Sequence, residues 1–224
     1  MGEARPYDVV TFDCYGTLID WERGITDAFL RAAAADGARL DPAAVVAAYH
    51  AVEPAVQAEG YRRYREVLAE TARRVAARLG WRLPATGGAF LPESLPDWPP
   101  FPDTPAALAR LAAAGYRLGI LSNVDEDLLA RSRRHLGAPF EFWVTAEAVG
   151  AYKPARPHFD RARERVAGRR WLHAAQSLFH DVVPARALGI PVAWINRKGE
   201  PAGDARPDRE LGSLAELADW LAPA

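Results

Sequence analysis

The stretch Asp8-Val-Val-Thr-Phe-Asp-Cys-Tyr-Gly-Thr-Leu18 decides the fold of this chain. Its first half is β-branched and apolar, which is typical of a buried strand, and the pattern breaks at Gly16, which indicates a tight turn. Asp13 stands at the carboxyl end of the predicted strand. A sheet presents its ligand-binding groups at that end, so Asp13 is the first candidate for a reactive side chain.

Four later segments have the same strand-like character, and helical patterns separate them. The predicted strands are residues 116–122, 140–145, 175–179 and 191–195, and the predicted helices are residues 105–114, 126–136, 157–167 and 183–188. Strands that alternate with helices form a parallel sheet covered on both faces. The sequence therefore predicts an α/β fold with a Rossmann-like core and a ligand site at the carboxyl ends of the strands.

A different pattern interrupts this alternation after the first strand. Residues 21 to about 90 are rich in Ala, Arg and Leu at helical spacing, and a proline-dense stretch at 92–102 leads back. We expect helices at about 25–35, 42–51 and 54–79, with Asp41 as an N-cap and Gly37 and Gly80 as stops. The predicted domains are a core of residues 1–20 and 99–224 and an inserted helical domain of residues 21–98.

The composition excludes several classes of protein. The 224 residues are 50% apolar and 25% charged, which is ordinary for a globular protein, and 28 basic residues balance 29 acidic ones. No net field attracts nucleic acid or an anionic membrane surface, and no apolar run approaches the roughly 20 residues of a spanning helix. The N-terminus lacks an apolar signal core, and the single cysteine has no partner for an internal disulfide. We expect a cytoplasmic protein that binds a small anionic substrate, with a homodimer left open.

Polar side chains follow four of the predicted strands. Each has a simpler interpretation when taken alone: an aspartate can cap its turn, a Ser-Asn pair can cap the next helix, and a lysine can be a surface charge. The chain contains only two lysines, however, and uses arginine elsewhere, so a lysine in this set indicates a function. Because parallel strands end at one edge, we expect these groups to converge. They are Asp13 and Thr17, Ser122 and Asn123, Lys153, and Asp181.

That convergence, in this order, resembles the haloacid dehalogenase superfamily of hydrolases. Asp13 through Thr17 match its nucleophile loop, Ser122 its second-motif hydroxyl, Lys153 its third-motif lysine and Asp181 its fourth-motif acid. The helical insertion is similar to the cap domain of the family. The resemblance covers most of the chain.

Within the superfamily, the motifs are most similar to the 2-haloacid dehalogenase branch. Phosphatases of the superfamily usually carry a second aspartate two residues after the nucleophile, where this chain has Tyr15, and a pair of fourth-motif acids that help to bind magnesium. Here Asp181 stands alone, with Gln176 five residues before it. A halide leaves without a proton, so carbon–halogen displacement tolerates the missing acid better than phosphoester cleavage does.

The resemblance implies a hydrolysis that needs no cofactor and no metal. Asp13 would attack carbon 2 of a haloalkanoate and form an ester, and water activated near Asp181 would release the 2-hydroxy acid. Thr17 would hold Asp13, Lys153 would balance the carboxylates, and Tyr15, Ser122 and Asn123 would bind the substrate. Two alternatives stay open. One is a Mg²⁺-dependent phosphatase of a small phosphorylated metabolite, and the other is a non-catalytic module with the same fold.

Two features depart from that branch. It commonly uses a cap arginine to hold the departing halide, but no arginine lies between Arg39 and Arg62, so His50 and the arginines of residues 61–64 are the substitutes, each of them more simply a solvated cap residue. Where the branch often has a tyrosine six residues after the motif lysine, this chain has Phe159. We also interpret His180, beside the fourth-motif aspartate, as a hydrogen-bonded structural group.

Overall fold

The structure is a computed structural model that describes residues 5–84 and 87–223. The chain divides into two compact units. The first unit contains the N-terminal segment through Ile19, Pro100–Asn123, and the chain from Arg133 onward. The second contains Asp20–Pro99 and Val124–Ser132. We describe each unit by itself.

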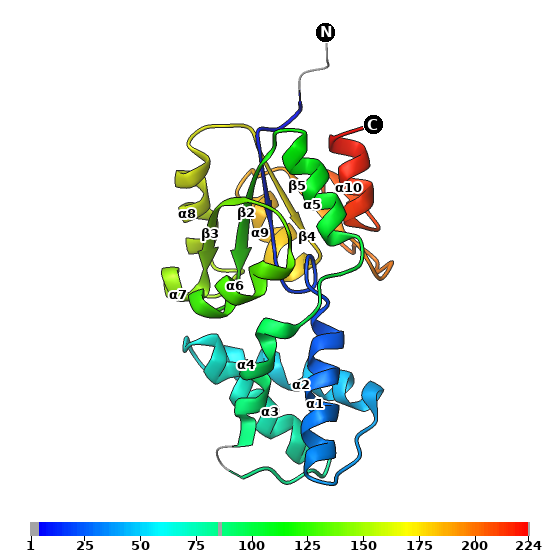
Figure 1. Ribbon diagram of the computed structural model, residues 1–224. Helices are drawn as coiled ribbons and strands as arrows, with labels where there is room; N and C mark the ends of the chain where they lie inside the picture. The colour runs from blue at the N-terminus through cyan, green and yellow to red at the C-terminus, as the bar shows by residue number, and fades with distance from the viewer. Residues whose placement is uncertain (1–4, 85–86, 224) are drawn as a thin grey trace. The chain divides into compact units, whose positions relative to one another are not determined.

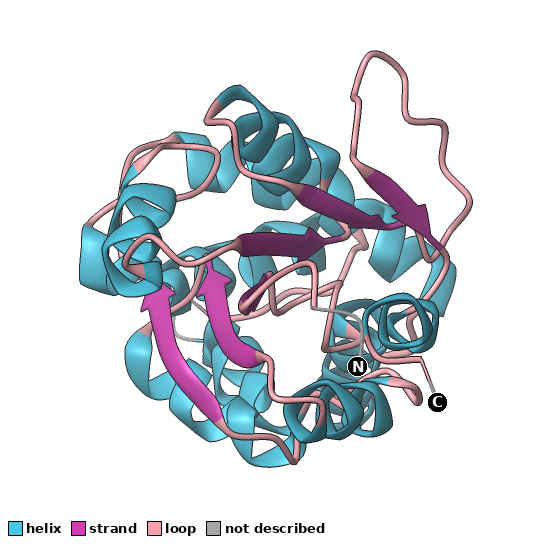
Figure 2. Ribbon diagram, turned by 90° about the horizontal axis from the view of Figure 1, so that it is seen from above, coloured by secondary structure: helices cyan, strands magenta, loops and turns pink. Residues whose placement is uncertain are grey.

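The first unit is built on a six-stranded parallel sheet with the strand order β3-β2-β1-β4-β5-β6. Figure 2 shows its strands in magenta among the helices. The chain order reverses beside β1, which lies between β2 and β4. This is the switch point at which open α/β sheets bind ligands, and Asp13 follows β1 directly. The predicted α/β fold with a parallel sheet is therefore confirmed. The strands are β1 (Val9–Phe12), β2 (Arg117–Ser122), β3 (Phe140–Thr145), β4 (Trp171–Ala175), β5 (Val192–Ile195) and β6 (Arg209–Leu211).

Helices cover both faces of this sheet (Figure 1). On one face α5 packs against α10, and the Arg110 and Tyr116 side chains donate hydrogen bonds to the last carbonyls of α10. On the other face α8 and α9 share an apolar cluster with the sheet that includes Phe159 and Trp194. The helical segments of this unit are α5 (Thr104–Ala113), η3 (Arg133–His135), α7 (Ala146–Val149), α8 (Pro157–Val166), η4 (Leu178–Val182), α9 (Val183–Ala187) and α10 (Leu214–Leu221).

The elements of regular secondary structure in the described part of the second unit are all helices. Asp41 caps α2, accepting a 2.8 Å hydrogen bond from Ala44 N, and Gly37 and Gly80 adopt φ angles of 72° and 75° just after α1 and α3. These caps agree with the predictions, but α2 runs through Pro54, where we expected a break. Pro54 lies on the exposed side of α2, where water can bond to the carbonyl that proline leaves unpaired. The segments are α1 (Trp21–Ala35), α2 (Pro42–Ala58), α3 (Tyr64–Arg78), η1 (Gly87–Ala89), α4 (Phe90–Ser94), η2 (Leu95–Asp97) and α6 (Glu126–Ser132).

The fourth strand was predicted in the wrong place. It occupies Trp171–Ala175, whereas the prediction put it at 175–179, and residues 178–182 form a π-helical turn. The prediction failed because His173, a polar residue, interrupts the apolar run in the middle of the true strand. His173 is nevertheless fully buried, because both of its ring nitrogens have hydrogen-bond partners.

One further expectation differs from the structure. Residues 124–132, which we assigned to the core, group with the helical unit, because Asp125 accepts hydrogen bonds from the N-terminus of α3. Residues 209–211 add the edge strand β6, which pairs with β5. Within the described chain, no helix combines the length and the hydropathy that crossing a lipid bilayer requires.

Candidate active site

The turn after β1 holds Asp13 in one orientation. Gly16 has a φ of 101°, and the backbone N–H groups of Leu18 and Ile19 both donate to the carbonyl of Cys14, at 2.8 and 2.9 Å. The Thr17 hydroxyl then lies 3.0 Å from Asp13 Oδ2, to which it donates. The backbone N–H of Gln176 donates to the same hydroxyl at 3.0 Å, so the only proton of Thr17 is directed at Asp13.

Lys153 joins the two aspartates. Its ammonium is 1% exposed and donates three hydrogen bonds, to Asp13 Oδ1 at 2.9 Å, Asp181 Oδ1 at 2.6 Å and the Leu121 carbonyl at 2.8 Å. All three ammonium protons are therefore used. Asn123 fixes the backbone of this lysine from both sides, accepting from Lys153 N at 2.7 Å and donating to Lys153 O at 3.0 Å.

Asp181 has one saturated oxygen and one open oxygen. Oδ1 accepts from Lys153 Nζ and from His173 Nε2, the latter at 2.9 Å. Oδ2 is buried and has no hydrogen-bond partner among the described residues, and the same holds for Ser122 Oγ. A buried polar atom without a partner costs free energy, so both atoms are suited to a water molecule or a substrate.

The surroundings shift the pKa values of the two carboxyl groups in opposite directions. Burial raises the pKa of Asp13, and the charge of Asp181 adds to this effect against the opposing attraction of Lys153. Burial also raises the pKa of Asp181, but Lys153 and His173 outweigh it and hold this pKa below the ordinary value. The carboxylates in turn raise the pKa of Lys153 although burial lowers it. The site thus contains an ammonium, a firmly ionised Asp181 and a more basic Asp13.

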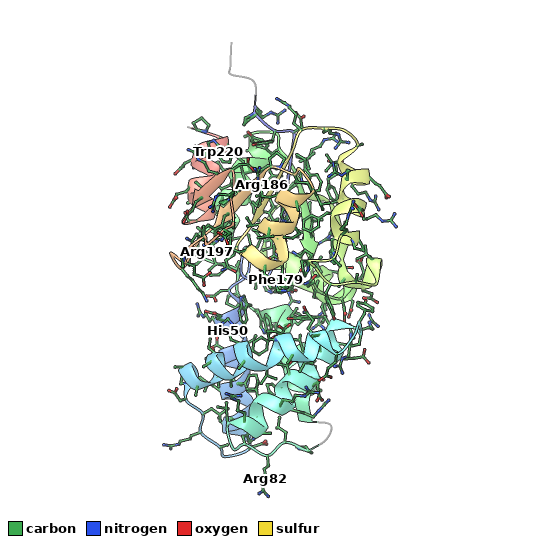
Figure 3. All side chains as sticks on the ribbon, turned by 180° about the vertical axis from the view of Figure 1, so that it is seen from behind. His50, Arg82, Phe179, Arg186, Arg197 and Trp220 are labelled. Carbon is green, nitrogen blue, oxygen red and sulfur yellow. The ribbon has the colours of Figure 1, made fainter. Side chains whose placement is uncertain are left out.

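Four other residues considered from the sequence make contacts of their own. His180 Nδ1 and the His180 backbone N lie 3.1 and 3.0 Å from Ser177 Oγ, and burial lowers the pKa of its ring, so it is neutral. Cys14 is fully buried, and burial raises the pKa of its thiol. Tyr15 lies in the turn, where it forms an isolated bridge with Ile19. His50, a predicted substitute for the halide arginine, pairs with Glu22 at 2.9 Å in the helical unit and is labelled in Figure 3.

Three residues that support the site were missed from the sequence. His173 contacts Asp181, and its only signal is a histidine within an apolar run. His158 lies with its Nε2 3.2 Å from the backbone carbonyl of Ser122, and burial lowers its pKa to about 4. Arg197, labelled in Figure 3, donates to the Thr17 carbonyl at 2.9 Å and pairs with Asp103. Arg197 lies two residues after the end of β5, and we predicted no role for it.

The donors at this site do not suit a divalent cation. The Lys153 ammonium occupies one oxygen of each aspartate, and Asp181 is the only acid among residues 176–181, which follow β4. No cluster of three or more His, Cys, Asp or Glu side chains in the described chain is arranged to hold a metal ion.

Residues 7–176 match the family model described as haloacid dehalogenase-like hydrolase. The chain belongs to this hydrolase family. The family resemblance predicted from the motifs is thus confirmed.

Individual relatives lie in more than one branch of the family. The (S)-2-haloacid dehalogenase H-109 of Pseudomonas putida is 35% identical over 127 residues, which are 54% of this chain and 57% of that protein. The match therefore spans little more than half of that relative. A phosphoglycolate phosphatase of Rhodospirillum rubrum is 30% identical over 95% of this chain and 90% of its own. The structure of the L-2-haloacid dehalogenase of Xanthobacter autotrophicus with chloropropionic acid covalently bound has a TM-score of 0.80 at 21% identity, covering 95% of this chain and 97% of that one. This last similarity shows the fold alone.

Proposed function

We propose that the protein hydrolyses small 2-haloalkanoic acids to 2-hydroxy acids through an ester of Asp13. The observation that carries this proposal is the setting of Asp13. Thr17 and Lys153 bond to its two oxygens, burial raises its pKa, and no second acid stands at Tyr15. Such a carboxylate is fixed, ionisable and nucleophilic. The family membership and the (S)-2-haloacid dehalogenase relative support the same reaction and suggest the S enantiomer.

The first step forms the ester. A carboxylate oxygen of Asp13 attacks carbon 2 of the haloacid, and the carbon–halogen bond breaks with its electron pair on the halide. A halide needs no proton, so no acid is required near the leaving group. Lys153 remains bonded to the aspartyl group and to Asp181, so one positive charge stays in the buried site throughout.

The second step cleaves the ester with water. The water oxygen attacks Cγ of Asp13, and its proton passes to Oδ2 of Asp181, the open oxygen of that carboxylate. The tetrahedral intermediate then expels the alkoxide of the 2-hydroxy acid, which takes the proton held on Asp181. Asp13 loses the remaining proton of the water and is regenerated as a carboxylate with one oxygen from water. The net products are the hydroxy acid, the halide and one proton.

We assign substrate binding to Ser122, Asn123 and Tyr15. Ser122 Oγ is buried without a partner in the described chain, so its hydroxyl is available for a substrate carboxylate. Asn123 already uses one N–H on the Lys153 carbonyl, which leaves its second N–H for the substrate. Tyr15 stands in the same turn as Asp13.

The competing function is a phosphatase of a small metabolite. The similarity to a phosphoglycolate phosphatase over nearly the whole chain favours it. It would require a leaving-group acid, which Tyr15 does not provide, and a metal that the donors around Asp13 do not suit. Mg²⁺ would be the cofactor only under this alternative.

A substrate panel in excess chelator separates the two functions. We expect halide release from (S)-2-chloropropanoate with EDTA present, and incorporation of ¹⁸O into Asp13 during a single turnover in H₂¹⁸O. Asp13→Asn should abolish halide release, whereas the matched control Asp219→Asn, an exposed carboxylate on α10, should not change it. Phosphate release that depends on Mg²⁺, without any halide release, would overturn the proposal in favour of the phosphatase.

A further inference from the structure

A chain of buried hydrogen bonds leads from two neighbouring strands to Asp181. Trp171 Nε1 lies 2.7 Å from Thr11 Oγ1, which lies 2.9 Å from His173 Nδ1, and His173 Nε2 lies 2.9 Å from Asp181 Oδ1. Thr11, His173 and Asp181 are fully buried, and Trp171 is 7% exposed. The reaction described above uses only the last member of this chain.

The strand register explains why these side chains meet. Thr11 on β1 is paired with His173 on β4, and Trp171 lies two residues before His173. Residues two apart on a strand point to the same face, so Thr11 contacts both. Asp13 follows Thr11 by two residues. The hydrogen-bond chain therefore belongs to the part of the sheet that holds the nucleophile.

The direction of the bonds defines the tautomer of His173. The Trp171 N–H can only donate, so it occupies a lone pair of the Thr11 hydroxyl. A proton on Nδ1 of His173 would leave the buried Thr11 proton without an acceptor, at a cost of about 1–3 kcal/mol. The carboxylate of Asp181 can only accept, so Nε2 carries the ring proton. The hydrogen bonds thus place a ring proton of His173 on Nε2, directed at Asp181.

The ring is also held in its plane. Phe159 contacts it edge to face, with ring centroids 5.7 Å apart and an interplanar angle of 86°. The 2-haloacid dehalogenase branch often has a tyrosine at the position of Phe159. In this chain the apolar ring at that position packs on His173. Because Thr11 and Phe159 both constrain the imidazole, Asp181 Oδ1 receives two fixed donors, His173 and Lys153.

We propose that His173 is a positioning residue for ester hydrolysis, which holds Oδ1 of Asp181 so that Oδ2 faces the attacking water. This inference rests on the proposed function, because it assigns His173 to the second of the two steps. It contacts neither substrate nor Asp13 and acts only through Asp181. Thr11 and Trp171 set its tautomer. Its loss should therefore slow the cleavage of the ester and leave its formation nearly unchanged.

Kinetics separate these two steps. Halide release makes ester formation irreversible, so kcat/KM reports that step, whereas kcat reports hydrolysis when that step limits turnover. We expect His173→Leu to lower kcat by about 10²-fold, as for the loss of an oriented proton acceptor, with kcat/KM within about threefold of wild type. KM should fall together with kcat, and mass spectrometry after rapid quenching should show the ester accumulating on Asp13.

Two variants test the role against a merely structural one. His173→Gln keeps a side-chain N–H near Asp181 and should recover most of kcat. Thr11→Val keeps the shape of the strand and the histidine but removes the hydrogen bond that anchors the ring at Nδ1, so we expect a smaller fall in kcat and partial ester accumulation. This variant carries the test if His173→Leu does not fold. His135→Leu, in η3, is the matched control and should behave as wild type.

The tautomer is measured without any turnover. Long-range ¹H–¹⁵N spectra of the full chain should show His173 protonated at Nε2 and not at Nδ1. A ring protonated at Nδ1, or kcat/KM falling as far as kcat in His173→Leu without ester accumulation, would overturn the inference. If wild type releases no halide and forms no ester, the proposed function fails, and the spectra still report on the hydrogen-bond chain.

Discussion

Two buried aspartate sites in this molecule bond their oxygens in opposite ways. In the helical unit, Asp125 is 1% exposed, and both oxygens are engaged by the N-terminus of α3. Oδ1 accepts from Tyr64 N at 2.7 Å, and Oδ2 accepts from Arg65 N at 3.2 Å and Arg65 Nε at 2.8 Å. In the first unit, Asp181 leaves Oδ2 without a partner in the described chain.

The difference teaches what distinguishes a reactive carboxylate from a structural one. Burial and ion pairing are common to both sites. Arginine has a planar fork of donors and joins backbone N–H groups around Asp125, whereas lysine provides a compact charge shared between Asp13 and Asp181. The arginine site leaves few lone pairs for chemistry, and the lysine site leaves several. Four substitutions test this difference between the two sites.

The largest effect is expected from Asp13→Asn. Loss of the nucleophile should lower halide release by about 10⁴-fold or more. The same change should raise Tm by roughly 2–4 °C, because it removes a buried carboxylate whose pKa is raised and whose charge therefore destabilises the folded state. Halide assays and calorimetry measure both effects. An unchanged or lower Tm would mean that Lys153 fully compensates the buried charge.

Next is the replacement of the buried lysine. Lys153→Met leaves two buried carboxylates without their shared cation and should cost about 3–5 kcal/mol of unfolding free energy, together with nearly all activity. Lys198→Met, at the exposed second lysine of the chain, is the matched control and should change neither quantity. Urea denaturation gives the difference. Equal stability of the two variants would show that the lysine cluster is not structurally required.

Asp125→Ala should have a smaller and purely structural effect. It removes a buried partner of Arg65 and of two backbone N–H groups, so we expect a loss of about 3 kcal/mol in the unfolding free energy. The kcat of the folded fraction should stay within about twofold of wild type. A large fall in kcat at full folding would contradict the distinction between the two sites.

The smallest effect concerns pH. Because burial raises the pKa of Asp13, the acid limb of kcat/KM should lie above pH 3.8, with activity lost as the pH falls through this raised value. The Thr17 hydrogen bond lowers that pKa, so Thr17→Val should move the limb further upward by less than about one pH unit. Asp181 differs from Asp13, because its pKa is lowered and its ionised form stabilises the folded state. Its lowered pKa stabilises the fold above about pH 4, and this is lost as the pH falls. A limb that moves downward in Thr17→Val would contradict this assignment.

Much of the fold and of the site was predictable because it depends on local pattern. Neighbouring side chains were enough to predict the strand before Asp13, the helix caps at Asp41 and Gly37, and the order of the motif residues. The fourth strand was not, because His173 reads as polar until its partners are known. Those partners come from β1 and from the π-helical turn, which are distant in the sequence or irregular.

The sequence by itself determined the α/β class, the helical insertion and the presence of an aspartate, a lysine and a second aspartate at strand ends. Hydrophobic periodicity and turn residues act over a few positions, so the elements that they specify can be predicted without knowledge of the tertiary structure. Only the tertiary structure decided which carboxylate oxygens remain open and that His173 holds Asp181. It also decided that Asn123 is bonded to the backbone of Lys153. These facts depend on distances between residues far apart in the chain, which no local pattern specifies.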